Sequence, residues 1–455
     1  PNVRVVAVKA VSTLMQWLES PQEHALGGQL LNPVLEVIQK CLAAGDEDTA
    51  TQAIEMLVSC VEQCFQVLET NLPTVVKYML DVATSVGKLE LNVREHAMIF
   101  VTECCAMKAK TLKKRHLIPT ILQGIFTLVS EEDEDEDDDD EDGRAYKFAT
   151  TCLDMLATNL PSKVLVPTIL QHCSAAVSSP SKWHRRGAMY LIGTVAEGCH
   201  ESLCQHLPQV LPWLLASMQD QEQVVKEAAF FALIQFAEFL QPEIVEHYEE
   251  MVPGILQALQ EKDPKVQEGA CHALEAFCEN LSEELTPYLP TLMTHMGNFL
   301  MSPSLEMRAR AMSAIASAAG ACGPAFKPYY PQTMQAIGEA MSSTDPEAFT
   351  LRSRATELGG ILAVVGEREL FDNDYQAFVA QALEGLKLDS NEIREYTYGA
   401  FANIAELYKG DRPELVAAVL PLLLESIDSK DGDGVHVTQH EDAAAQALPP
   451  MVGQD

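Results

Sequence analysis

Residues 225–233 read VKEAAFFAL, residues 266–274 read VQEGACHAL, and residues 307–315 read MRARAMSAI. The three segments begin 41 residues apart and follow one pattern, with an apolar residue first, alanine four and seven residues later, and another apolar residue at the ninth place. Apolar and small residues at these intervals lie on one face of an α-helix. The segments therefore predict three equivalent helices in a repeating structure.

The same pattern extends in both directions along the chain. The ten units begin at Val3, Thr49, Val93, Ala145, His184, Val225, Val266, Met307, Leu351 and Ile393. The fifth residue, called position +4 with the first as 0, is alanine in nine units, and Thr397 is the exception. A small residue at a fixed point allows neighbouring helices to approach closely. Position +1 is often basic, as at Arg94, Arg185 and Lys226.

A second helix register precedes each of these units. It begins with a proline and an apolar stretch, as in LPTVVKYML and VPGILQAL, and only the helix around Phe378 lacks the proline. Proline is tolerated near a helix start, where the amide has no intrahelical partner. Two helices in each 39–52 residues match the period of HEAT repeats. We therefore predict an all-α fold, a right-handed α-α superhelix (solenoid) of about ten HEAT repeats.

The predicted solenoid spans residues 1–429, and residues 430–455 are expected to form a flexible tail because their composition turns to Gly, Asp and Gln. The ends of a solenoid need polar capping repeats. Neither end of this sequence has that character, so we expect the chain to be the central part of a longer protein.

The charge balance limits the classes of partner. With 31 basic and 66 acidic side chains the formal net charge is −35, so nucleic acid and anionic membrane surfaces are expected to be repelled and a basic protein attracted. Acidity can also serve solubility alone. The twelve cysteines fall mainly within apolar helical patterns and are expected to be reduced core thiols.

One segment interrupts the repeat with an unbroken run of carboxylates. A run of like charges cannot pack and is expected to form a solvated loop between the two helices of one repeat. We predict that it contacts a partner, and an inert insertion is the alternative. The run comprises Glu131, Glu132, Asp133, Glu134, Asp135, Glu136, Asp137, Asp138, Asp139, Asp140, Glu141 and Asp142.

A second acidic feature follows from helix geometry. Positions +2, +6, +9 and +13 lie opposite the alanine-bearing stripe, and stacking would align them into one ribbon, which we call the acidic ribbon. Only Lys9, Lys147 and Arg186 oppose its carboxylates, although a solvated face of an acidic protein would look similar. The acidic ribbon comprises Glu55, Glu62, Glu95, Asp154, Glu197, Glu227, Glu238, Glu268, Glu275, Glu279, Glu357, Glu395 and Glu406.

No catalytic, cofactor-binding or metal site is predicted. Cys199, His200, Cys204 and His206 lie close together in sequence, but no second pair of ligands follows at the spacing of a zinc site. The sequence has no phosphate-binding glycine loop, dinucleotide fingerprint or nucleophile elbow. The protein is therefore not expected to be an enzyme.

Several segments resemble the importin-4 and importin-5 branch of the karyopherin-β (importin-β) family. They are WHRRGAMYLIGTVAEGCH at 183–200, QVVKEAAFFALIQFAEFLQPEIVEHYEEMVPGILQAL at 223–259 and CHALEAFCENLSEELTPYLPTLM at 271–293. The resemblance covers nearly the whole chain and includes the acidic run. It implies a nuclear import receptor that shuttles between cytoplasm and nucleus, contacts the FG repeats of the nuclear pore, and carries basic cargo such as histones or ribosomal proteins.

The resemblance also implies that cargo lies on the concave face formed by the second helices and that Ran-GTP releases it. The family's main Ran-binding repeats are N-terminal and have no counterpart here, although the acidic run resembles a Ran-contacting loop. We predict that cargo contacts residues 131–142 together with Glu197, Glu227, Glu238, Glu268, Glu275 and Glu279. The alternative is a static HEAT scaffold such as a phosphatase scaffolding subunit.

Overall fold

The computed structural model describes residues 2–15, 17–132 and 145–428, and all regular structure in these ranges is helical. Nine pairs of antiparallel helices follow one another, flanked by α1 (Asn2–Met15) and α23 (Pro413–Asp428). The predicted all-α solenoid of HEAT-type repeats is confirmed. The predicted tail, residues 430–455, lies outside the described residues. No helix in the described ranges is long and apolar enough to cross a bilayer.

Each repeat contributes one first helix and one second helix. The first helices are α3 (Leu31–Ala43), α6 (Leu72–Ala83), α8 (Ile118–Val129), α10 (Ser162–Ala176), α13 (Leu207–Met218), α15 (Tyr248–Ala258), α17 (Leu289–Leu300), α19 (Tyr330–Met341) and α21 (Tyr375–Gly385). The second helices are α4 (Glu47–Gln63), α7 (Leu91–Lys114), α9 (Ala145–Asn159), α11 (Lys182–Thr194), α14 (Gln223–Phe239), α16 (Pro264–Cys278), α18 (Leu305–Cys322), α20 (Phe349–Phe371) and α22 (Asn391–Tyr408). Short helices join the repeats: α2 (Pro21–Gly28), α5 (Phe65–Glu69), α12 (His200–Cys204), η2 (Glu243–His247), η3 (Glu283–Tyr288), η4 (Gly323–Tyr329) and η5 (Pro346–Ala348).

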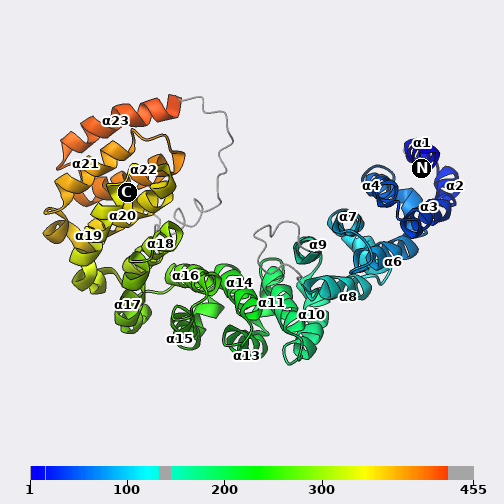
Figure 1. The fold of residues 1–455 in the computed structure, drawn as a ribbon, viewed down its shortest axis with the longest axis horizontal. Coiled ribbons are helices and arrows are strands. Elements are labelled where there is room, and N and C mark those ends of the chain that lie inside the picture. The colour runs from blue at the N-terminus through cyan, green and yellow to red at the C-terminus, as the bar shows by residue number, and fades with distance from the viewer. Residues whose placement is uncertain (1, 16, 133–144, 429–455) are drawn as a thin grey trace, which may run out of the picture.

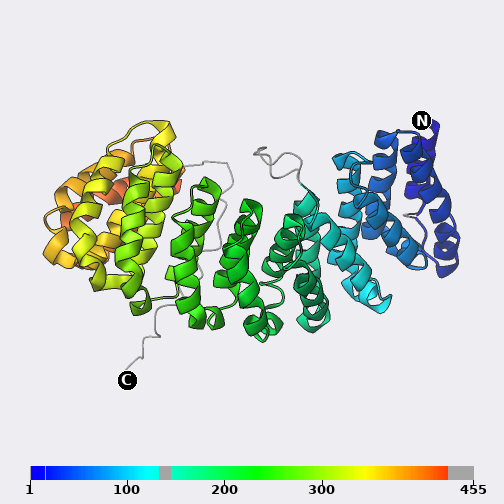
Figure 2. The same ribbon diagram turned by 60° about the horizontal axis from the view of Figure 1, so that its bottom comes forward.

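The helix pairs form a curved row. Figure 1 shows the first helices, such as α13, α15 and α17, along the outer edge of the arc and the second helices, such as α14, α16 and α18, along its inner edge. Figure 2 shows the pairs standing side by side in one continuous row. The second helices therefore line the concave surface of the solenoid.

The alanines at position +4 are buried in the packing of the second helices. Eight of them, from Ala53 to Ala355, are at most 3% exposed, and Thr397 at the same position is fully buried. Only Ala7, in α1, is exposed. The burial expected at position +4 is confirmed, and second helices of adjacent repeats pack directly on one another along the row.

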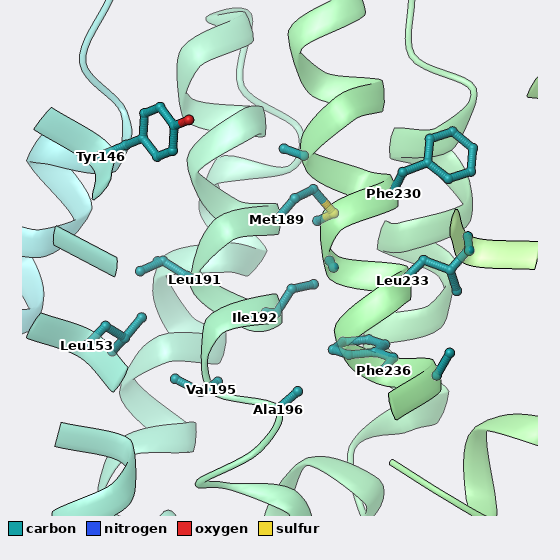
Figure 3. Close-up of a cluster of buried hydrophobic side chains, with 14 of the residues drawn as sticks. Tyr146, Leu153, Met189, Leu191, Ile192, Val195, Ala196, Phe230, Leu233 and Phe236 are labelled. Atoms are coloured by element: carbon teal, nitrogen blue, oxygen red, sulfur yellow. The ribbon is translucent and has the colours of Figure 1, made fainter. Parts of the chain in front are cut away.

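Larger apolar side chains pack between successive second helices. In the close-up of Figure 3, Leu191 of α11 points toward α9 and Ile192 points toward α14, and the same cluster includes Leu153 of α9 and Leu233 and Phe236 of α14. All five are at most 1% exposed. All twelve cysteines are free, and Cys204 is the only one that is not buried. The expectation of reduced core thiols is therefore confirmed for eleven of them.

We expect Ala311→Leu to destabilise the protein by about 1–3 kcal/mol, because extra methylenes in a close-packed contact force shifts in side chains and backbone. Ala311 is fully buried in α18. Urea unfolding monitored by circular dichroism measures the change. The control is Ala402→Leu in α22, where the side chain is exposed. Equal stability of Ala311→Leu and the parent protein would show that position +4 tolerates bulk.

Three of the basic residues at position +1 join a repeat to the next one through ion pairs. Arg185 at the start of α11 forms a two-pronged ion pair with Asp220, which follows α13 in the next repeat, with Nε–Oδ2 2.7 Å and Nη2–Oδ1 2.9 Å. Lys226 of α14 contacts Glu261 of the next repeat at 2.6 Å. Arg94 of α7 pairs in the same way with Glu131, which follows α8. These pairs fix the relative position of adjacent repeats.

Candidate protein-binding surface

The acidic ribbon lies on the second helices, which line the concave surface (Figure 1). None of its thirteen carboxylate side chains is buried, so they are not part of the core. Six are partly buried, and seven are exposed: Glu55, Glu62, Glu197, Glu238, Glu279, Glu395 and Glu406. Carboxylates on these helices that remain accessible to solvent are available to contact a partner.

Carboxylates of successive repeats lie close enough to repel one another. Burial and the neighbouring Glu197 raise the pKa of Asp154. Burial raises the pKa of Glu357, with Glu395 of the next repeat adding to the shift and Arg354 opposing it. Negative charges therefore face one another across these two repeat boundaries, and a cationic partner would relieve this repulsion.

The ribbon contains more cations than the sequence pattern indicated. Arg310 of α18 reaches back to Glu268 of α16, with Nη2–Oε1 2.7 Å, and Arg354 of α20 contacts Glu357 at 3.4 Å. Both arginines occupy position +3, which was outside the four positions assigned to the acidic face. Arg186, which was assigned to that face, is instead 3% exposed. The predicted composition of this face, thirteen acids against three bases, is therefore wrong, because Arg310 and Arg354 are added and Arg186 is buried.

Glu275 differs from the other predicted contact residues. Burial raises its pKa to about 7, against the opposing effect of Arg310 and Arg354, and its Oε1 atom is buried without a hydrogen-bond partner. A carboxyl group with this pKa is only partly ionised at neutral pH. Glu275 is therefore a weaker candidate for binding a cation than the exposed Glu238 or Glu279.

We expect Glu275→Gln to stabilise the protein by about 1–3 kcal/mol more at pH 8 than at pH 5. The folded-state pKa of about 7 lies above the ordinary value of 4.5, so the folded state binds the proton more tightly. Wild-type stability is thus lost as the pH rises from about 4.5 to 7, while glutamine stays neutral throughout. Urea unfolding at both pH values measures the difference, and Glu279→Gln at an exposed site is the control. If Glu275→Gln stabilised the protein equally at both pH values, the raised pKa of Glu275 would be contradicted.

An aromatic hollow opens within the acidic surface. Its volume is about 380 Å³, and its lining includes Tyr190 of α11, Phe231 and Glu227 of α14, and Glu268 and His272 of α16. The ring centroids of Tyr190 and Phe231 are 5.4 Å apart. Sequence reasoning missed this hollow, although position +6 offered the signal because Tyr190, Phe231 and His272 all occupy it. Lys147 and Lys265 also line the hollow, and Glu268 is already paired with Arg310, so the charge around the hollow is mixed. Its aromatic part can take an apolar group.

Only the start of the acidic run is described, and Asp133, Glu134, Asp135, Glu136, Asp137, Asp138, Asp139, Asp140, Glu141 and Asp142 lie outside the described residues. Glu131 is not a solvated loop residue as expected, since its carboxylate pairs with Arg94 and is 13% exposed. Arg186 donates from Nη2 to the Glu131 carbonyl at 2.8 Å. Glu131 is therefore an anchor, and the candidate contact segment begins at Glu132.

Comparison with known proteins agrees with the helical-repeat architecture. The family model described as TORTIFOLIA1 N-terminal matches residues 140–398, and the model described as IPO5-like, TPR repeats matches residues 1–78. Because the first match covers more than half of the 455 residues, the chain belongs to the family of helical-repeat proteins that this model describes.

Within that class, the chain is homologous to importins. It is 30% identical to human Importin-4 over 248 residues, which is 51% of this chain and 23% of the human protein. It is 27% identical to the probable importin subunit beta-4 of Schizosaccharomyces pombe over 200 residues, which is 44% of this chain and 18% of that protein. The aligned segments therefore span about a quarter or less of the length of these relatives.

Solved structures of Kap121p share the fold. The crystal structures of Kap121p bound to Pho4p and to Nup53p superpose with TM-scores of 0.85 and 0.84 at 22% and 23% identity. Each comparison covers 98% of this chain and 44% of the Kap121p chain. The karyopherin arrangement of repeats is thus reproduced over nearly the whole chain.

Proposed function

We propose that this chain is the cargo-binding part of a nuclear import receptor that shuttles between cytoplasm and nucleus. The acidic ribbon on the concave surface carries the proposal, because its carboxylates repeat along the groove and remain accessible. The homologous importins, and the Kap121p structures with Pho4p, Ste12p and Nup53p, support a receptor role.

The cargo best matched to this surface is a lysine-rich, extended protein segment of the histone or ribosomal-protein type. Lysine ammonium groups would pair with Glu197, Glu238 and Glu279, and an apolar group or lysine stem would occupy the hollow between Tyr190 and Phe231. Each exposed ion pair contributes little alone, about 0–1 kcal/mol. Affinity then depends on the number of contacts, and it is sensitive to salt.

Release by Ran-GTP is part of the proposal for the longer protein. A ligand shifts a conformational equilibrium only when it binds the two states with different affinity. A solenoid in which neighbouring repeats are joined by discrete pairs such as Arg185–Asp220 can change its pitch by small changes at each interface. The proposed cycle contains only binding and release, without a bond-making step.

Contact with nuclear-pore FG repeats is proposed for the outer surface. A cleft of about 680 Å³ lies between the first helices α17 and α19, where Met293, Leu300 and Tyr329 contribute apolar lining. Met301 beside it is 84% exposed. A phenylalanine side chain fits a cleft of this composition, and the outer position leaves the concave groove free for cargo.

The proposal is tested by titrating the chain into a fluorescent lysine-rich histone-tail peptide at several salt concentrations. We expect binding at low salt that weakens steadily as the salt concentration rises, and no binding of a peptide in which every lysine is replaced by glutamine. Equal binding of both peptides, or binding unaffected by salt, would contradict a carboxylate-lined cargo groove. A static scaffold would bind neither peptide.

We expect replacement of residues 132–142 by a Gly/Ser linker of equal length to slow association with the histone-tail peptide, most clearly at low salt. Eleven tethered carboxylates attract a basic segment and speed its encounter. The melting temperature should stay nearly the same or rise slightly, because Glu131 and its pair with Arg94 are retained and like-charge repulsion is removed. Stopped-flow fluorescence measures the rate. An unchanged rate at every ionic strength would show that the loop is only a spacer.

A further inference from the structure

Three side chains with metal-binding atoms meet at the junction of two neighbouring repeats. His200 and Cys204 lie one helical turn apart in α12, and Glu243 begins η2. The ligand atoms of the three all lie within 4.8 Å of one another. The sequence pattern grouped His200 and Cys204 with Cys199 and His206 and missed Glu243, because Glu243 lies in the next inter-repeat connection.

The backbone around this cluster is held by buried neighbours. Leu203 of α12 is 1% exposed and Ile244 of η2 is fully buried, and the Ile244 amide donates to the Leu240 carbonyl at 2.9 Å. These contacts anchor both short helices against the core. The three donor groups are therefore presented by fixed elements, which lowers the entropy lost on binding.

One donor atom lacks a partner in the cluster's present arrangement. Oε2 of Glu243 is buried without a hydrogen-bond partner, and leaving a carboxylate oxygen in this condition costs free energy. A divalent cation between the Cys204 sulfur and the Glu243 carboxylate would satisfy this oxygen.

We propose that His200, Cys204 and Glu243 form a zinc-binding site that joins adjacent repeats. An imidazole nitrogen, a thiolate sulfur and a carboxylate oxygen are ligands typical of Zn²⁺, and the sulfur donor disfavours Mg²⁺ and Ca²⁺. Binding transfers the Cys204 thiol proton to solvent as the sulfur–zinc bond forms. Thiolate and carboxylate then balance the metal's two positive charges, and water completes the coordination.

The position of the site gives zinc a mechanical consequence. α12 leads into α13 and η2 leads into α15, so one ion would link the entrances of two successive first helices. The three ligand atoms lie within 4.8 Å of one another. Each would sit about 2.0–2.3 Å from a bound zinc ion, so only a small movement of the side chains is required. Zinc would thus stiffen the junction between these two repeats.

The test uses the reduced full chain, freed of metal with a chelator. Zinc is then added in competition with a chromophoric chelator. We expect one equivalent to bind to the parent protein, and at least a tenfold weaker affinity in Cys204→Ser and in Glu243→Gln. His206→Gln is the matched control, because His206 lies in the same turn but its Nδ1 is engaged with the Ser202 carbonyl at 2.7 Å; this variant should bind as the parent does.

Cobalt provides an independent readout, because a Co²⁺–thiolate bond gives a charge-transfer absorption band. The band should appear with the parent and His206→Gln and be absent with Cys204→Ser. Zinc should also raise the melting temperature of the parent and leave that of Cys204→Ser unchanged. No bound equivalent, or the same zinc affinity in the parent and in Cys204→Ser, would overturn the proposal.

Discussion

Arg94→Ala is expected to destabilise the protein by about 3–5 kcal/mol, the usual cost of breaking a buried ion pair by removing one partner. The Arg94 side chain is 6% exposed and that of Glu131 is 13% exposed. Arg94 donates from Nη1 to Glu131 Oε1 at 2.9 Å, pairs through Nη2 with Oε2, and donates from Nε to the Ala83 carbonyl at 2.8 Å. Alanine would leave the Glu131 carboxylate and that carbonyl without these donors.

The loss should be concentrated where two repeats meet. Arg94 belongs to α7, whereas Glu131 follows α8 of the next repeat, and the stability of a solenoid is approximately a sum of repeat and interface contributions. Urea unfolding gives the total change, and hydrogen exchange should show the largest loss of protection in α8 and α9. The control is Lys40→Ala, which removes an exposed pair with Glu36 and should cost at most about 1 kcal/mol.

A second variant separates charge burial from packing. Arg94→Met combined with Glu131→Leu removes both charges and keeps apolar volume, so it should recover most of the stability lost in Arg94→Ala. If Arg94→Ala costs less than about 1 kcal/mol, the ion pair does not secure the interface. If the double variant is as unstable as Arg94→Ala, the stability of the interface depends on the shape of these two side chains rather than on the pairing of their charges.

The repeat architecture could be predicted because it depends on local periodicity. The alanines at position +4 recur every 39–52 residues, and Ala270 and Ala311 are fully buried as that pattern requires. The basic residues at position +1 were also visible. Their partners were not, because Asp220, Glu261 and Glu131 lie in the next repeat at positions that no helical period marks.

The composition of the candidate surface could be predicted only in part. Helical phase placed Glu238 and Glu279 on exposed positions of the inner helices correctly, since the phase of a single helix is a local property. The neutralising contact of Arg310 with Glu268 and the approach of Tyr190 to Phe231 depend on how helices of different repeats are offset. The sequence alone does not reveal how helices of different repeats are offset from one another.

The triple variant Glu197→Lys, Glu238→Lys and Glu279→Lys is expected to weaken binding of the lysine-rich peptide roughly a hundredfold. These residues share position +13 in three successive repeats and are all exposed. An exposed contact contributes about 0–1 kcal/mol, and reversal replaces attraction by repulsion of similar size, so three reversals amount to about 3 kcal/mol. Because the side chains lie outside the core, the melting temperature should change little.

A matched triple variant on the first helices distinguishes the concave surface from overall charge. Glu36 of α3, Glu339 of α19 and Glu384 of α21 are exposed acids on the outer layer, and their reversal to lysine changes the net charge by the same amount. Long-range attraction weakens equally in both variants and is screened by salt. At physiological ionic strength the outer variant should therefore bind nearly as the parent does, while the inner variant stays strongly impaired. Equal losses in the two variants would mean that the protein attracts basic segments through its total charge, and the acidic ribbon would then not be the binding site.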